Sequence, residues 1–222
     1  MLRNLLFVSI ILISQNIWAQ TNYALNFNGS SDYVDLGNAP YQNNFTIEAW
    51  IKTTSSAIEK NIVGWGHSSN NDNVQLRVES GKLQYGMDVS GWQSVISSGN
   101  VNSGEWVHVA MVKNSTSIQF YINGAPDGSG IITVPFPTIN KMLIGVHYKA
   151  GTINTGTYFS GQIDEVRFWN TTRTQTQIQQ NAGIELNGDE PGLVAYYKMS
   201  NGNGSTLSDN KSGGIYNGSI NG

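Results

Sequence analysis

Apolar and polar residues alternate with a period of two in many short segments of the chain. In residues 45–52, Phe, Ile, Ala and Ile alternate with Thr, Glu, Trp and Lys, and in residues 106–111, Trp, His and Ala alternate with Val, Val and Met. Such alternation is typical of half-buried β-strands. Similar segments predict further strands at 24–27, 33–36, 61–65, 74–78, 82–88, 117–122, 142–148, 161–168 and 193–199.

Turn residues separate these segments at short intervals. Asn123-Gly124 is the clearest of them, because both residues tolerate the positive φ values of a two-residue hairpin. Pro126 follows closely and cannot donate a ladder hydrogen bond, so we expect the second arm of this hairpin to be cut short and to lie at a sheet edge.

One short helix is predicted at 174–182. Thr174 and Gln177 have the spacing of a capping box, and Gly183 is a candidate left-handed stop. Many short strands with one surface helix favour an all-β fold, an antiparallel two-sheet jelly-roll sandwich. The tail, residues 200–222, is rich in Asn, Gly and Ser and is expected to be weakly ordered or to form a final strand.

The composition limits the function classes. The 222 residues include 12 Lys and Arg, 15 Asp and Glu, 26 Asn, 25 Gly and no Cys, with a net charge of -3. The scattered basic residues form no cationic patch, so nucleic acid is not expected as a partner. The absence of Cys excludes disulfides, thiolate catalysis and Cys-based metal sites.

The N-terminus has the pattern of a signal peptide. Arg3 precedes the apolar run Leu5–Ile13, and Ile17-Trp18-Ala19 resembles a small-residue cleavage site before Gln20. The apolar run is well short of the ~20 residues of a membrane-spanning helix, so no membrane insertion is expected after cleavage. We therefore predict a signal peptide at 1–19, one domain at 20–222, and bacterial-type export to the cell surface or the extracellular space.

Seven segments, in order, resemble a known family. They are Ala24–Val34 (ALNFNGSSDYV), Phe45–Ile51 (FTIEAWI), Gly104–Ala110 (GEWVHVA), Tyr121–Gly124 (YING), Leu143–Gly145 (LIG), Phe159–Asn170 (FSGQIDEVRFWN) and Gly192–Tyr197 (GLVAYY). Together they are similar to the LamG-like jelly-roll domain of the concanavalin A-like lectin/glucanase superfamily. The resemblance implies two packed antiparallel sheets, a structural calcium ion, and glycan binding or adhesion.

No pair of carboxylates matches the catalytic pattern of the glucanase relatives, Glu-x-Asp-x-x-Glu on one strand. Asp164 and Glu165 are adjacent, so their side chains should leave opposite faces of a strand. Glu48 shares a face with Trp50 and could form half of a sugar platform; the alternative is an exposed or ion-paired carboxylate. His67, His108 and His147 lack the short spacing of a metal site. We expect no catalytic residues.

Calcium prefers oxygen ligands, including backbone carbonyls of Gly- and Asn-rich turns. Residues 28–32 form such a turn, and the family resemblance brings it close to Asp164. The predicted metal ligands are Asn28, Gly29, Asp32 and Asp164. The alternative is that Asp164 accepts backbone hydrogen bonds or pairs with an arginine such as Arg77.

Aromatic rings near Gly- and Asn-rich loops are the candidates for glycan contact, since a planar ring matches the apolar face of a sugar. They are Trp65, Tyr85, Trp92 and Tyr148; for Trp92, exposure and burial under a loop both fit the sequence. Trp50, Trp106 and Trp169 lie within the strand motifs and are expected to pack structurally.

The sequence thus predicts an exported, non-catalytic carbohydrate-binding or adhesion module with a structural calcium ion, whose partner is a glycan or a glycosylated surface. Two alternatives stay open: a polysaccharide-degrading enzyme on the same scaffold, and a structural spacer of a larger surface protein. Whether the chain is a stand-alone module or a fragment that adjoins other modules is also open.

Overall fold

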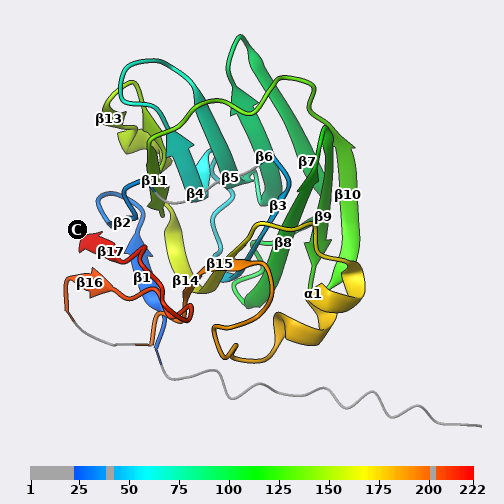
Figure 1. Cartoon of the computed structure of the whole chain (residues 1–222). Helices are drawn as coiled ribbons and strands as arrows, with labels where there is room; N and C mark the ends of the chain where they lie inside the picture. Colours follow the sequence, from blue (N-terminus) through cyan, green and yellow to red (C-terminus); the bar gives the residue numbers. More distant parts are fainter. Residues whose placement is uncertain (1–22, 39–42, 201–203) are drawn as a thin grey trace, which may run out of the picture.

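The computed structural model of the chain describes residues 23–38, 43–200 and 204–222. Its main elements are two large antiparallel β-sheets (Figure 1). Sheet A has the strand order β1 (Leu25–Asn28), β14 (Ser160–Trp169), β3 (Phe45–Lys52), β8 (Trp106–Asn114), β9 (Ser117–Ile122) and β10 (Ala125–Ile131), and β15 (Leu193–Tyr197) also pairs with β14. Sheet B has the order β16 (Thr206–Leu207), β17 (Gly218–Asn221), β2 (Tyr33–Asp35), β11 (Lys141–Ile144), β4 (Lys60–Gly66), β5 (Asn73–Glu79), β6 (Lys82–Asp88) and β7 (Trp92–Asn100).

The inner faces of the two sheets enclose one large apolar core. The ring of Phe45 on β3 lies 6.3 Å from the rings of both Trp65 on β4 and Tyr85 on β6, measured between centroids. These contacts join sheet A to sheet B, and the predicted jelly-roll sandwich is confirmed. Sheet pairs of this kind need inward-facing apolar residues at every second position, which is the alternation seen in the sequence.

The predicted strands are present with shifted ends. The largest difference is at 142–148, where β11 ends at Ile144 because Gly145 turns the chain with φ +86°. The chain then forms the short hairpin of β12 (Tyr148–Lys149) and β13 (Thr152–Ile153), followed by the 3₁₀ turn η1 (Thr155–Thr157). Strand β7 was missed by the sequence reasoning, because its Ser and Gly content is typical of loops.

The strand after Asn123-Gly124 is an edge strand, as predicted, but it is not cut short. Strand β10 spans seven residues and accommodates Pro126 through a bulge between Pro126 and Ser129. The carboxylate of Asp127 accepts hydrogen bonds from the backbone N–H groups of Ser98 and Gly99 on β7. These contacts close one side of the sandwich, where the edges of sheets A and B lie against each other.

The helix α1 (Gln175–Ala182) has the predicted start. Thr174 and Gln177 form the capping box, and Ile178 packs on Ala110 and Val112 at the outer face of sheet A. Gly183 has φ -114°, so the left-handed stop predicted for it is wrong. None of the described helices is long and apolar enough to span a membrane.

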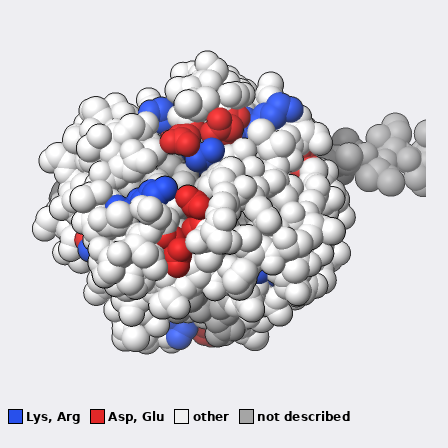
Figure 2. Space-filling model, turned by 90° about the horizontal axis from the view of Figure 1, so that it is seen from above, with Lys and Arg blue, Asp and Glu red and all other residues white. Residues whose placement is uncertain are grey.

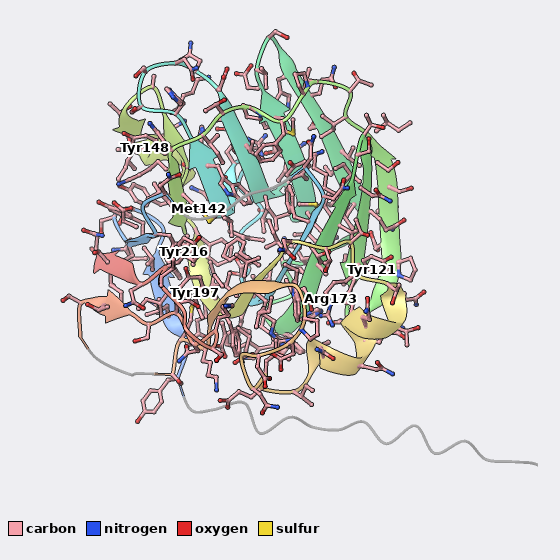
Figure 3. All side chains as sticks on the ribbon, viewed as in Figure 1. Tyr121, Met142, Tyr148, Arg173, Tyr197 and Tyr216 are labelled. Atoms are coloured by element: carbon pink, nitrogen blue, oxygen red, sulfur yellow. The ribbon has the colours of Figure 1, made fainter. Side chains whose placement is uncertain are left out.

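The C-terminal tail completes sheet B. Strand β17 pairs with β2, and the hydroxyl of Tyr197 on β15 donates a hydrogen bond to the carbonyl of Tyr216, so the two labelled tyrosines lie side by side in Figure 3. The predicted final strand is therefore present. The predicted signal peptide, residues 1–19, lies outside the described residues.

Candidate functional site

The outer face of sheet B carries a row of polar side chains on β5 and β6. Val74, Leu76 and Val78 point into the core, so the residues that alternate with them point outward. The register sets the outward-facing pairs Asn73 opposite Asp88, Gln75 opposite Gly86, and Arg77 opposite Gln84. We call the set of residues on this side of the sheet the polar face; it consists of Asn73, Gln75, Arg77, Gln84, Gly86, Asp88 and Trp92. Asn73, Gln75 and Arg77 are buried, whereas Gln84, Asp88 and Trp92 reach solvent.

The indole of Trp92 lies over Gly86 on this face. Trp92 starts β7, and a Cβ atom added to Gly86 would lie only 2.2 Å from Cζ2 of its indole ring. The glycine therefore provides the space that the ring occupies. The Trp92 side chain stays 40% exposed, so its outward surface is open to a ligand.

Arg77 braces the indole from the sheet side. Its guanidinium carbon lies 4.8 Å from the Trp92 ring centroid, a cation–π contact. The guanidinium is itself held by Gln84, which accepts from Nε at 2.8 Å, and by Gln75, which accepts from Nη1 at 2.9 Å. Trp92 is thus preorganised, and its orientation costs little entropy when a ligand binds.

The β12–β13 hairpin covers the other end of the outer face. Backbone atoms of Val146 to Tyr148 lie directly over Gly64 and Gly66 of β4, where any Cβ atom would clash with them. Tyr148 is half-buried there, with Nζ of Lys141 at 6.0 Å from its ring centroid. Figure 3 shows Tyr148 at the upper left of the molecule, on this hairpin.

His147 is buried under the same hairpin. It is 2% exposed, and within the described parts of the chain neither ring nitrogen has a hydrogen-bond partner. Burial, with the positive charges of Lys149 and Arg77, lowers the pKa of His147 to about 4, while Asp88 acts in the opposite direction. The imidazole is therefore neutral at pH 7.

We expect His147 to make folding pH-dependent. Its pKa is lower in the folded chain than the 6.5 of the free side chain, so the unfolded state binds more protons between pH 6.5 and about 4. Stability is then complete above pH 6.5 and falls by roughly 3 kcal/mol as the pH drops towards 4. Urea unfolding at a series of pH values measures this loss. His147→Gln should flatten the curve between pH 6.5 and 5, where most carboxylates stay ionised; an unchanged slope would contradict the assignment.

Two of the four predicted glycan-contacting aromatics lie on the inner side of sheet B. Trp65 is 2% exposed and Tyr85 is fully buried, and both pack in the core against Phe45. Their placement on an exposed rim was wrong. The alternation already contained this signal, because Tyr85 is in phase with Leu83 and Met87 and Trp65 is in phase with Val63. Trp92 and Tyr148 are the two that reach the outer side.

The polar partners of Trp92 were not identified from the sequence as candidate ligand contacts. Arg77 and Gln75 belong to a strand that was predicted correctly, and their alternation with Val74, Leu76 and Val78 places them on one outer face. What the sequence could not show is that the indole from the next hairpin lies over this particular face.

The predicted calcium ligands do not come together. On β14, Asn28 pairs with Ser160, whereas Asp164 lies four positions further along, roughly 13 Å away. Asp164 is buried and accepts a hydrogen bond from the backbone of Glu165, in line with the first alternative above. No group of three or more acidic or histidine side chains suited to a metal occurs among the described residues. The four-residue calcium set is therefore wrong as a single site.

The Asn28–Asp32 turn is closed by its own hydrogen bonds. The Asp32 carboxylate accepts from the backbone and the amide of Asn28, and the Asn28 side-chain oxygen accepts from Ser30 and Ser31. Asp32 also borders a pocket of about 350 Å³ between β1, β2 and β17. It is the single carboxylate that this turn supplies.

The outer face of sheet A is occupied by the chain itself. Glu48 is fully buried, its Oε1 lies 2.6 Å from Nη1 of Arg173, and its Oε2 lies 3.3 Å from Nε2 of His108 without hydrogen-bond alignment. Burial raises the pKa of Glu48, and His108, Arg173 and Arg167 lower it by more, so it ends below its ordinary value. Arg173 lies near the base of the sandwich beside α1 (Figure 3). Glu48 is therefore ion-paired and does not form a sugar platform.

Two tryptophans of sheet A, Trp50 and Trp169, contact the segment that covers the outer face of this sheet. The guanidinium carbon of Arg173 lies 3.8 Å from the ring centroid of Trp169, and Nε1 of Trp50 donates a hydrogen bond to the carbonyl of Ala182 at the end of α1. These residues hold the helix and the segment after it onto sheet A. The structural role predicted for Trp50 and Trp169 fits these contacts.

Several solved structures share the fold of this chain. A candidate carbohydrate-binding protein from Bacteroides ovatus superimposes with a TM-score of 0.63 at 19% identity, over 89% of this chain and 59% of that one. A second structure is domain 4 of AbnA, a GH43 extracellular arabinanase from Geobacillus stearothermophilus, in complex with arabinotriose. It superimposes with a TM-score of 0.59 at 22% identity, over 72% of this chain and 75% of that one. The CBM40 of the Ruminococcus gnavus IT-sialidase, bound to α2,3 sialyllactose, superimposes with a TM-score of 0.59 at 15% identity, over 72% of this chain and 95% of that one. This chain thus spans little more than half the length of the first of these proteins.

The sequence itself matches one family model. That model, Laminin_G_3, is described as the concanavalin A-like lectin/glucanases superfamily and covers residues 28–179, which run from the end of β1 into α1. A search among curated proteins finds no match. The match extends over more than half of the chain and agrees with the two-sheet jelly roll, so the chain belongs to the Laminin_G_3 family of the concanavalin A-like lectin/glucanase superfamily.

Proposed function

We propose that this protein is a non-catalytic carbohydrate-binding module whose ligand stacks on Trp92. The observation that carries the proposal is the preorganised indole: one part rests over Gly86 and against Arg77, and the rest is exposed. Aromatic rings of this kind offer an apolar surface to the C–H groups of a sugar ring. Gln84 and Asp88 beside it are partly exposed and can bond hydroxyl groups.

The relatives in fold support a glycan as the ligand. The arabinanase domain holds arabinotriose and the sialidase module holds sialyllactose. At these identities they share only the fold with this chain, so the residues of the polar face, rather than the relatives, define the proposed contact.

The carboxylates near Trp92 argue for binding rather than hydrolysis. Glu59 and Glu79 both contact the guanidinium of Arg77, each at 3.1 Å. A glycosidase needs one protonated carboxylic acid that reaches the glycosidic oxygen and a second free carboxylate. Both groups here are directed at the same cation, and Asp88, opposite Trp92 in the ladder, pairs with Lys149. An adhesion role would use the same contact with a glycosylated surface.

A glycan array and titration calorimetry test the proposal. We expect at least one oligosaccharide or polysaccharide to bind without being shortened. Cleavage of the bound glycan would instead identify an enzyme on this scaffold. An empty array together with flat calorimetry, on protein that melts cooperatively, would favour the structural spacer and end the proposal.

We propose export through the N-terminal signal peptide, which fits a module that meets glycans outside the cell. N-terminal sequencing of protein recovered from the producing cells should begin at Gln20. Retention of Met1 would contradict it.

We also propose that a structural calcium ion binds at Asn28, Gly29 and Asp32, without Asp164. An ion that binds only the folded state stabilises it by about 2.7 kcal/mol at a concentration about 100 times its Kd. Chelation should then lower the melting temperature by roughly 5 to 10 °C. Asp32→Asn should remove the response, whereas Asp72→Asn, a matched half-buried carboxylate in the β4–β5 turn, should keep it. A melting temperature that chelator does not change would end this proposal.

A further inference from the structure

We propose that the polar face selects uncharged glycans and discriminates against acidic ones, because every cation beside Trp92 is already neutralised by this chain. The inference rests on the proposed function and adds the class of ligand. It follows from how the charged groups of the polar face are paired.

Arg77 is the cation that contacts the Trp92 ring, and each of its three guanidinium nitrogens already has a partner in this chain. Its Nε and Nη1 donate to Gln84 and Gln75, while Nη1 and Nη2 face Glu59 and Glu79 at 3.1 Å. All three guanidinium nitrogens are therefore engaged. An acidic sugar is usually recognised by a free, bidentate guanidinium, and Arg77 cannot provide one without breaking these contacts.

The two carboxylates on Arg77 also set the sign of the local field. Glu79 is 19% and Glu59 43% exposed in its side chain, and both lie beside one arginine that is 7% exposed. A ligand carboxylate that approached Arg77 would meet two like charges at short range. Such contacts are destabilising and are weakly screened where they are partly buried.

The lysines of this face are also occupied. Lys149 pairs with Asp88 at 3.3 Å, whereas Lys82 lies at the far end of β6 from Asp88 and donates to the carbonyl of Ser98. Seen from above, most of the acidic groups lie next to basic groups, and most of the surface visible in this view carries no charge (Figure 2). The polar face thus offers the Gln84 amide and an aromatic ring, but no unpaired positive charge, to a ligand.

In another protein the same fold accepts an acidic ligand, since the sialidase module is bound to sialyllactose. The fold alone therefore does not decide the charge of the ligand. In this chain the side chains of β5, of β6 and of the segment before β4 decide it.

Matched glycans that differ only in charge provide the test. The methyl ester of sialyllactose against sialyllactose, and methyl-esterified against de-esterified polygalacturonan, are compared by affinity electrophoresis and calorimetry at about 0.05 and 0.5 M NaCl. We expect binding to uncharged glycans, with an affinity that salt changes less than twofold. A preferred acidic ligand whose affinity falls with salt would overturn the selectivity but leave the proposed function intact, whereas no binding to any glycan would overturn both.

Freeing Arg77 provides a second, independent test. In Glu59→Gln the exposed carboxylate that faces Nη1 is replaced by an uncharged side chain of the same size, which removes one of the like charges that a ligand carboxylate would meet at Arg77. We expect affinity for de-esterified polygalacturonan to rise about tenfold, the size of one charge-assisted hydrogen bond, with affinity for the neutral form unchanged. Glu105→Gln, an exposed carboxylate before β8, is the matched control and should change neither. If the wild type and Glu59→Gln bound de-esterified polygalacturonan with equal affinity, the proposed role of the Arg77 ion pairs in selectivity would be contradicted.

Discussion

Trp92→Ala should abolish glycan binding while leaving the fold intact. The indole is the exposed centre of the polar face, and truncation of such an aromatic anchor costs about 2 kcal/mol or more, a loss of at least roughly 30-fold in affinity. Because 40% of the side chain is already exposed, the melting temperature should fall by only a few degrees. Calorimetry with a glycan found on the array measures the affinity, and differential scanning fluorimetry measures the melting temperature.

Tyr23→Ala is the matched control, since Tyr23 is an aromatic residue that is 55% exposed just before β1. It should leave affinity unchanged. Gly86→Ala tests the same site without removing the indole: the new Cβ would lie 2.2 Å from the ring and must displace it. Affinity should fall, and the indole fluorescence of the free protein should change. Full affinity in Trp92→Ala would exclude the polar face as the binding site.

Glu48→Ala should strongly destabilise the fold. The carboxylate is fully buried under the segment that leads into α1 and balances Arg173, which is itself 8% exposed. Removing one partner of a buried ion pair leaves the other uncompensated, at a cost of about 3 to 5 kcal/mol. For a chain of this size the melting temperature should fall by roughly 10 °C. Thermal and urea unfolding measure both quantities.

Glu48→Gln separates the charge from the volume, because the amide fills the same space and can still accept from Arg173. It should recover part of the loss. Glu185→Gln, which removes an ion pair with Lys198 at the surface, should cost less than about 1 kcal/mol. A Glu48→Ala variant as stable as Glu185→Gln would show that Arg173 finds another partner.

The strand pattern and the helix start were predictable because they depend on local chemistry. Alternation of apolar residues at 45–52 and 74–78 reports directly which positions face the core, and the Thr174–Gln177 box needs only residues within one turn. The same alternation would have placed Tyr85 inside the sandwich. Strand β7 was missed because its Ser and Gly residues form a strand only through pairing with β6 and contact with β10.

The sequence by itself determined the all-β class, the order of most strands, the capped helix, the scarcity of charge and the family. Only the tertiary structure decided the sites, because a site joins residues that are distant in the chain. The sheet register separates Asp164 from the Asn28 turn, the fold of residues 170–182 buries Glu48, and the hairpin before β7 lays Trp92 over Gly86 and Arg77. Each outcome depends on which strands are neighbours and which face is covered, and local patterns do not contain that information.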